Sequence, residues 1–199
     1  MRDTTKYQGI IPAFYACYDD NGEISPERVE ALIRHLIAKG VKGVYACYDE
    51  EGNISTKGVE DLTHYLVKKG VKGVYVGGSS GECIYQSVEE RKIVLEHVVK
   101  AAEGKLTIIA HVACNNTKDS KVLAAHAESL GVDAIAAIPP IYFHLPEYAI
   151  AEYWNDISSA APNTDFVIYN IPQLAGVALT MPLFHKMLEN PNVAAVKNS

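Results

Sequence analysis

The residue with the clearest chemical potential in this 199-residue chain is Lys197, close to the C-terminal end. It comes after the apolar run at residues 193–196, which has the composition of a buried strand. Burial of a lysine is unusual, and it lowers the pKa of the amine so that the neutral, nucleophilic form becomes available. Such an amine can form a Schiff base with a ketone. On periodicity alone, an exposed lysine near the terminus is the better explanation.

A glycine- and serine-rich segment forms a second candidate site. Residues 75–82 read YVGGSSGE and stand between a predicted strand and a predicted helix. Glycine at Gly78 lets the backbone approach a ligand, and backbone N–H groups with the Ser79 and Ser80 hydroxyls can bind an anion. No G-K-[ST] comes after it, so a small carboxylate is a better ligand than a phosphate. The alternative is a tight turn with a serine helix cap.

Tyr169 ends another apolar run and is succeeded by NIPQLAG at residues 170–176. A tyrosine at the C-terminal end of a barrel strand points to the usual active-site face, where its hydroxyl can relay a proton. A purely structural tyrosine before a proline turn is the alternative.

Short apolar runs alternate with amphipathic stretches, which predicts parallel strands joined by helices with right-handed crossovers. Helix starts are well marked, for instance by the capping box SVEE at residues 87–90. The predicted strands are residues 10–15, 43–47, 73–77, 107–113, 134–138, 166–171 and 194–197, and the predicted helices lie near 26–39, 56–69, 88–103, 118–130, 147–160 and 181–189. A (β/α) barrel and an open doubly wound sheet both fit this α/β pattern.

Residues 15–44 are repeated at residues 45–74, with 18 of 30 positions identical. This length is about that of one strand-plus-helix unit, so one unit is duplicated. The second copy begins at a shared tyrosine, Tyr45, which indicates recombination or engineering. A solenoid would need a third copy. We expect one domain over residues 1–199.

The composition is that of a globular protein, with 48% hydrophobic residues and a net charge of −6. This charge and the lack of a Lys/Arg run argue against a nucleic-acid partner. No apolar stretch is long enough to span a membrane, and the polar start MRDTTKYQG does not resemble a signal peptide. We expect a cytoplasmic protein without a metal site. Its four cysteines, with no C-x-x-C or zinc spacing, are predicted to be reduced: Cys17, Cys47, Cys83 and Cys114.

In combination, these segments resemble the pyruvate-dependent class I aldolases, the family that includes N-acetylneuraminate lyase and dihydrodipicolinate synthase. The resemblance rests on GIIPA at residues 9–13, GGSSGE at 77–82, AHVAC at 110–114, the Y-N-I-P-x-x-x-G segment and the final V-K. It implies an eight-stranded (β/α) barrel, usually tetrameric, that needs no metal or organic cofactor. By the same resemblance, Lys197 forms the Schiff base with pyruvate and Tyr169 shuttles the proton. Ser79 and Ser80 hold the pyruvate carboxylate beside Gly78.

Two positions favour the lyase branch. Synthases of this family typically have an arginine two residues after the proline of Y-N-x-P, where this chain has Leu174. The GGSSGE loop is also closer to the lyase form. The resemblance therefore implies reversible cleavage of N-acetylneuraminate to pyruvate and N-acetylmannosamine. A synthase-like enzyme or another 2-keto-3-deoxy sugar acid aldolase is the alternative.

The chain departs from the family in its duplicated unit and in the region after Lys197. The family's last strands, and the glycine and acidic residues that grip the sugar, are missing there. We therefore expect an incomplete (β/α) barrel of about seven parallel strands with impaired turnover. Its exposed strand edges favour a homo-oligomer, or extrusion of one repeat copy. The alternative function is a non-catalytic, truncated or engineered repeat form of the barrel.

Overall fold

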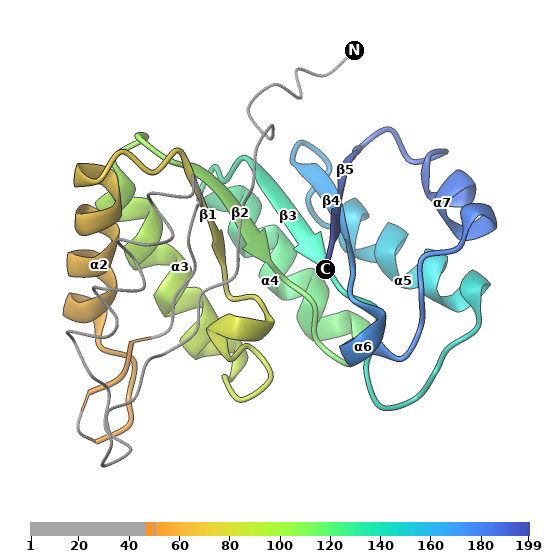
Figure 1. Ribbon diagram of the computed structural model, residues 1–199, viewed down its shortest axis with the longest axis horizontal. Coiled ribbons are helices and arrows are strands. Elements are labelled where there is room, and N and C mark those ends of the chain that lie inside the picture. Colours follow the sequence, from red (N-terminus) through yellow and green to blue (C-terminus); the bar gives the residue numbers. More distant parts are fainter. Residues whose placement is uncertain (1–46, 50) are drawn as a thin grey trace. The chain divides into compact units, whose positions relative to one another are not determined.

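The computed structural model describes residues 47–49 and 51–199 (Figure 1). The chain divides into two compact units. The first contains the described residues up to Ile108, and the second runs from Ile109 to Ser199. The strand predicted at residues 10–15, the helix predicted near 26–39 and the first repeat copy lie outside the described residues. Of the strand predicted at 43–47, only Cys47 is described, and it has no regular secondary structure.

In the first unit, helix α2 (Thr56–Lys68) packs against helix α3 (Val88–Ala102), and Figure 1 shows the two side by side. The Ser55 hydroxyl caps α2 by accepting a hydrogen bond from the backbone N–H of Gly58. Ser87 and Glu90 form the predicted capping box at the start of α3. Both starts are therefore set by local sequence, because each helix begins where a serine oxygen can satisfy an otherwise unpaired N–H group.

A polar cluster links α2 to α3. The Glu60 carboxylate of α2 lies 2.7 Å from Lys100 Nζ and 2.6 Å from His97 Nδ1 of α3. Lys100, and next His97, hold the pKa of the Glu60 carboxyl below its usual value by hydrogen bonding. Beneath this cluster α2 buries the side of the helix that carries Val59, Thr63 and Leu66. Helix α2 belongs to the second repeat copy, so that copy supplies a packed helix.

Strand β1 (Gly73–Val76) comes after α2 and is buried along its whole length. It leads into the short 3-10 helix η2 (Ser79–Gly81). The next strand, β2 (Thr107–His111), starts beside it, because the Thr107 N–H donates a 2.9 Å hydrogen bond to the carbonyl of Lys72. Strand β2 then continues into the second unit.

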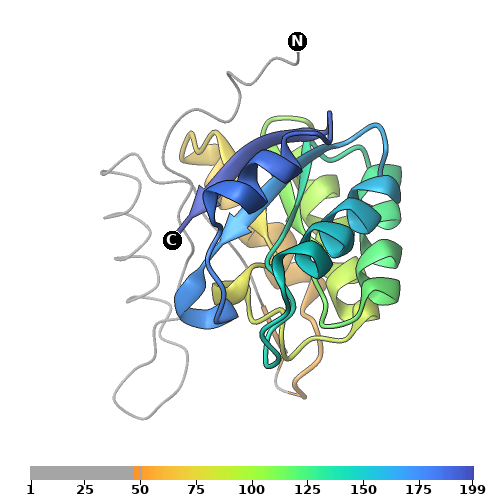
Figure 2. The ribbon, with the colours of Figure 1, turned by 90° about the vertical axis from the view of Figure 1, so that its right-hand side faces the viewer.

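The second unit is a ladder of parallel strands in which each strand pairs with the next one along the chain. Figure 2 shows the last two of these strands, in blue, side by side. After β2 come β3 (Ala134–Ala137), β4 (Asp165–Asn170) and β5 (Val193–Asn198). The helices between them are α4 (Thr117–Ser129), α5 (Glu147–Ser159), α6 (Pro172–Ala175) and α7 (Met181–Met187). Helix α5 packs against both α4 and α7. Its buried side carries Ile150, Trp154 and Ile157, whose spacing of three to four residues is that of a helix face.

The described elements agree with the predicted ones to within two residues at each end, with two additions, the short helices η2 and α6. Strand β2 ends at His111, two residues earlier than predicted. The segment after Tyr169 was predicted as a proline turn, but it contains the short helix α6 with Pro172 at its first position. Proline suits that position because its missing N–H would be unpaired there in any case.

Strand β5 contains one residue more than its partner requires. Phe166 of β4 pairs with Val193, but the next residue, Val167, pairs with Ala195. The additional residue, Ala194, forms a β-bulge. From Val167 onward the register is regular, and it pairs Tyr169 with Lys197. Without the bulge Lys197 would pair with Asn170, on the opposite face of the sheet.

Candidate active site

The two residues predicted to carry the chemistry lie together in the second unit. Lys197 Nζ lies 3.4 Å from the centre of the Tyr169 ring, over its face. Register partners on parallel strands project to the same side of a sheet, so the pairing of β4 with β5 explains this contact. The amine also donates a 2.7 Å hydrogen bond to the Ser199 hydroxyl.

The surroundings of Lys197 favour its neutral form. Its side chain is half-buried, and burial lowers the pKa of the amine from 10.5 to about 8. The Tyr169 ring, which is 2% exposed, covers the amine on one side. An amine with this pKa is partly neutral near physiological pH, which is the form that attacks a carbonyl carbon.

A histidine that sequence reasoning left without a role stands next to this pair. The His111 and Tyr169 rings meet edge to face, with ring centres 6.0 Å apart and an interplanar angle of 83°. His111 ends β2, and both rings are almost completely buried. His111 belongs to the AHVAC segment, which supports the family resemblance, and this membership could have marked it as a site residue.

The predicted serine turn lies in the first unit and is described there by itself. Ser79 and Ser80 are half-buried at the start of η2, directly after buried Gly78. The Gly78 carbonyl accepts the N–H of Gly81 at 2.9 Å, which closes the turn. Within the described residues, neither serine hydroxyl has a hydrogen bond. The turn thus presents two hydroxyls at the end of a buried strand, as an anion pocket would require.

Glycine is required at position 78 because the turn rests on the ring of Tyr75. A Cβ atom at Gly78 would lie 2.7 Å from Tyr75 Cε1, closer than side-chain atoms normally approach. Tyr75 is 2% exposed and has little room to move. The glycine therefore allows the backbone of the serine turn to lie directly on an aromatic ring.

Gln86 braces the same turn from its C-terminal side. Its amide Nε2 donates to the Gly81 carbonyl at 3.3 Å and to the Tyr48 hydroxyl at 3.0 Å. Burial is the main cause that raises the pKa of Tyr48, so the phenol stays protonated. Tyr48 belongs to the second repeat copy, which therefore contributes to the support of the serine turn as well as to α2.

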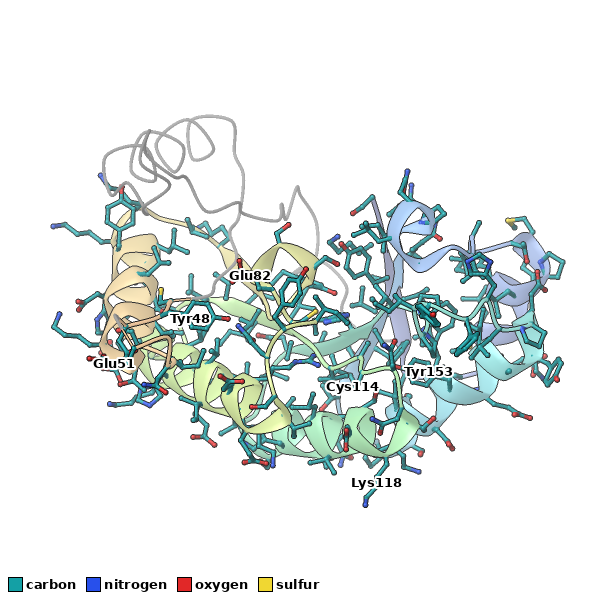
Figure 3. All side chains as sticks on the ribbon, turned by 90° about the horizontal axis from the view of Figure 1, so that it is seen from below. Tyr48, Glu51, Glu82, Cys114, Lys118 and Tyr153 are labelled. Carbon is teal, nitrogen blue, oxygen red and sulfur yellow. The ribbon has the colours of Figure 1, made fainter. Side chains whose placement is uncertain are left out.

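The loop after His111 is fixed by two hydroxyl groups in the second unit. The Tyr153 hydroxyl of α5 donates to the Cys114 carbonyl at 2.7 Å, and Figure 3 shows the two residues next to each other. Ser120 of α4 accepts the Cys114 N–H at 2.8 Å. Asn115 Oδ1 accepts the N–H of Ile141, which connects this loop to the one after β3. The loop that follows His111 is thereby held by side chains of α4 and α5 and is joined to the loop after β3.

Four further findings concern the exposure of Leu174, metal binding, the Cys47 thiol and membrane crossing. Leu174, the position that distinguishes the two branches of the resembled family, lies on α6 and is 59% exposed. Within the described residues, no group of three or more His, Cys, Asp and Glu side chains is placed to hold a metal ion. Burial raises the pKa of the Cys47 thiol to about 11, so this thiol is a poor nucleophile. None of the helices in the described part has the length and hydrophobicity needed to cross a membrane.

The chain matches the model of the dihydrodipicolinate synthetase family over residues 44–199. It is also 68% identical over 199 residues to a curated N-acetylneuraminate lyase from Mediterraneibacter gnavus. That match covers all of this chain and 54% of the relative. The chain therefore spans about half the length of the curated relatives it matches.

Two solved structures of Ruminococcus gnavus sialic acid aldolase resemble the chain. A catalytic lysine mutant matches with a TM-score of 0.83 and 68% identity, over 100% of this chain and 55% of its own. The wild type matches with a TM-score of 0.77 and 80% identity, over 79% of this chain and 54% of its own.

These similarities confirm the predicted fold class, an incomplete (β/α) barrel. The predicted number of seven strands is not tested, because two of those strands fall outside the described part or at its margin. The family match covers residues 44–199, which include the serine turn, Tyr169 and Lys197. The chain belongs to the dihydrodipicolinate synthetase family.

Proposed function

We propose that this chain carries the Schiff-base chemistry of a class I pyruvate lyase, with Lys197 as the nucleophile. The observation that carries the proposal is the half-buried Lys197 amine, 3.4 Å from the centre of the Tyr169 ring and with a pKa lowered to about 8. A buried lysine without a chemical task is rare, because burial of its charge costs free energy. The resemblance to N-acetylneuraminate lyases supports the same role.

In the first step, the neutral Lys197 amine attacks the ketone carbon of pyruvate. The carbonyl oxygen leaves as water, and a protonated imine remains on the lysine. This imine withdraws electrons from the neighbouring methyl carbon, so that carbon can lose a proton and become an enamine. The enamine carbon then forms a bond to an aldehyde, or, in reverse, is released when that bond breaks. No metal or organic cofactor is required for these steps.

Tyr169 is the proposed proton shuttle, since its phenol can donate a proton to the developing alkoxide and take it back. Ser79 and Ser80 are proposed to hold the pyruvate carboxylate through their hydroxyls and backbone N–H groups, with Gly78 allowing close approach. An ionised carboxylate is a strong hydrogen-bond acceptor, so two hydroxyls and a turn of N–H groups form a suitable pocket.

The proposed substrate is N-acetylneuraminate, cleaved reversibly to pyruvate and N-acetylmannosamine. The names of the relatives and the apolar Leu174 support it. Because these 199 residues span 54% of a relative's length, we propose that they carry Schiff-base formation and that sugar turnover is weak. We further propose that the chain works in the cytoplasm as a homo-oligomer, because an incomplete barrel would leave strand edges available for pairing with another copy.

Borohydride reduction in the presence of pyruvate tests the first step. We expect a mass increase on the peptide that contains Lys197, because borohydride converts the imine to a stable secondary amine. The Lys197→Ala variant should lose this adduct. Lys186→Ala, which removes an exposed lysine of α7 in the same unit, should retain it. Wild-type chain without an adduct at Lys197 would refute the proposed function.

A second candidate is a non-catalytic form of the barrel, favoured by the half-length match to the relatives. The two candidates differ in whether the chain forms the imine at Lys197 and in whether it then releases pyruvate from the sugar acid. Assay of pyruvate release from N-acetylneuraminate by the same preparation separates them. An adduct together with slow release supports the impaired lyase, whereas absence of both supports the non-catalytic form.

A further inference from the structure

We infer that His111 is a positioning residue for this chemistry and that its imidazole holds the Tyr169 ring over the Lys197 amine. The inferred role in catalysis rests on the proposed function, in which Lys197 is the Schiff-base nucleophile. The contacts that support it are all within the second unit, from the last residue of β2 through β4 to β5.

The register of the sheet places the three side chains on one face. His111 pairs with Ala136 of β3, and Ala136 pairs with Val167 of β4. Tyr169 stands two residues beyond Val167, hence on the same face, and pairs with Lys197 of β5. Imidazole, phenol and amine therefore project from the same side of neighbouring strands.

A small residue between β2 and β4 makes the ring contact possible. The residue of β3 on this face between His111 and Val167 is Ala136, which is completely buried. A larger side chain there would fill the space across which the His111 and Tyr169 rings meet. Their edge-to-face arrangement is the favourable one for aromatic rings and leaves the Tyr169 ring little freedom to turn.

The orientation of Tyr169 matters because its ring covers the amine. With Nζ only 3.4 Å from the ring centre, rotation of the ring would admit water to Lys197. Among the described residues, the titratable groups near this amine include the Tyr169 phenol on β4 and, beyond it, His111 on β2. Burial is the cause of the lowered pKa, so better hydration of Lys197 would bring its pKa back toward 10.5.

The test measures how readily Lys197 reacts at different pH values, by two methods. Competitive labelling with acetic anhydride, and then mass analysis of the Lys197 peptide, reports the neutral amine without pyruvate. Pyruvate–borohydride trapping reports the same group as nucleophile. For His111→Ala we expect roughly a tenfold smaller neutral fraction near pH 7, and a matching loss of trapping rate. His111→Phe, which keeps an aromatic edge, should restore most of both.

Controls separate this role from a general loss of structure. His185→Ala removes an exposed histidine of α7 in the same unit and should leave the labelling profile unchanged. If His111→Ala does not fold, His111→Leu fills the space without an aromatic edge, and the same loss is expected. An unchanged labelling profile in these variants, or a His111→Phe profile as altered as that of His111→Ala, overturns the inference. Absence of trapping in the wild type would instead refute the proposed function, while labelling still tests His111.

Discussion

Lys197 owes its lowered pKa to burial. The Lys197 amine is shielded from solvent by the Tyr169 ring and by the position of the lysine on β5. The identity of both residues could be predicted from the sequence, because each ends an apolar run in a recognisable segment. Their contact could not, since it depends on the register between two strands 28 residues apart. His111 was missed for the same reason, because its partner lies two strands away.

At the residue scale, the lowered pKa predicts how Schiff-base formation depends on pH. The amine is protonated below its pKa and cannot attack, so the rate should rise about tenfold per pH unit below the midpoint. Above that point it should level off. The midpoint is expected near the pKa of about 8, which initial rates of pyruvate trapping can measure. A midpoint near 10.5, the ordinary value for lysine, would show that the amine is fully hydrated.

Among the elements, the helices were the most predictable, because their starts depend on adjacent residues such as Ser55 and Ser87. The β-bulge at Ala194 was not predictable. A run of small apolar residues predicts a strand whether or not that strand contains a bulge. Only the register of β5 against β4 reveals the additional residue. This bulge decides whether Lys197 faces Tyr169, so the most important feature of β5 is set by tertiary pairing.

The hydrogen bond by which Tyr153 of α5 holds the loop after β2, here called the clamp, gives a prediction at the element scale. The Tyr153 hydroxyl donates to the Cys114 carbonyl and lies 3.0 Å from Ser120 Oγ. Tyr153→Phe removes this donor from a buried site and should lower the free energy of unfolding by about 1 kcal/mol. Urea denaturation measures it. Tyr148→Phe, at a residue 71% exposed on the same helix, is the matched control and should have no effect. Equal values for both variants would contradict the role of the clamp.

For the molecule as a whole, the repeat is the most unusual feature of the sequence. The family match starts at residue 44, and the second copy supplies α2 and the Tyr48 brace. The residues by which α2 is buried on α3 are largely repeated in the sequence: Val59 corresponds to Val29, Glu60 to Glu30 and Leu66 to Leu36. The duplication could be read directly from the sequence. The structure adds that α2, from the second copy, packs against α3.

We therefore predict that removal of residues 15–44 leaves a folded chain. The deletion joins Phe14 to Tyr45 and so restores the same FYACYD sequence that Phe14 begins in the full chain. Thermal unfolding should show an equal or higher midpoint, and pyruvate trapping at Lys197 should persist. Gel filtration of both forms tests the proposed homo-oligomer. An insoluble product, or one without a cooperative transition, would mean that the first copy is needed for folding.

The order of the strands has a consequence for how such a protein can change over evolutionary time. Each strand of the second unit lies beside its predecessor in the chain, so no segment has to be threaded between others. A segment of coding sequence that encodes one strand-plus-helix unit can therefore be gained while the other strands keep their order and connections. An architecture of this kind tolerates copying errors that would ruin a Greek-key sandwich.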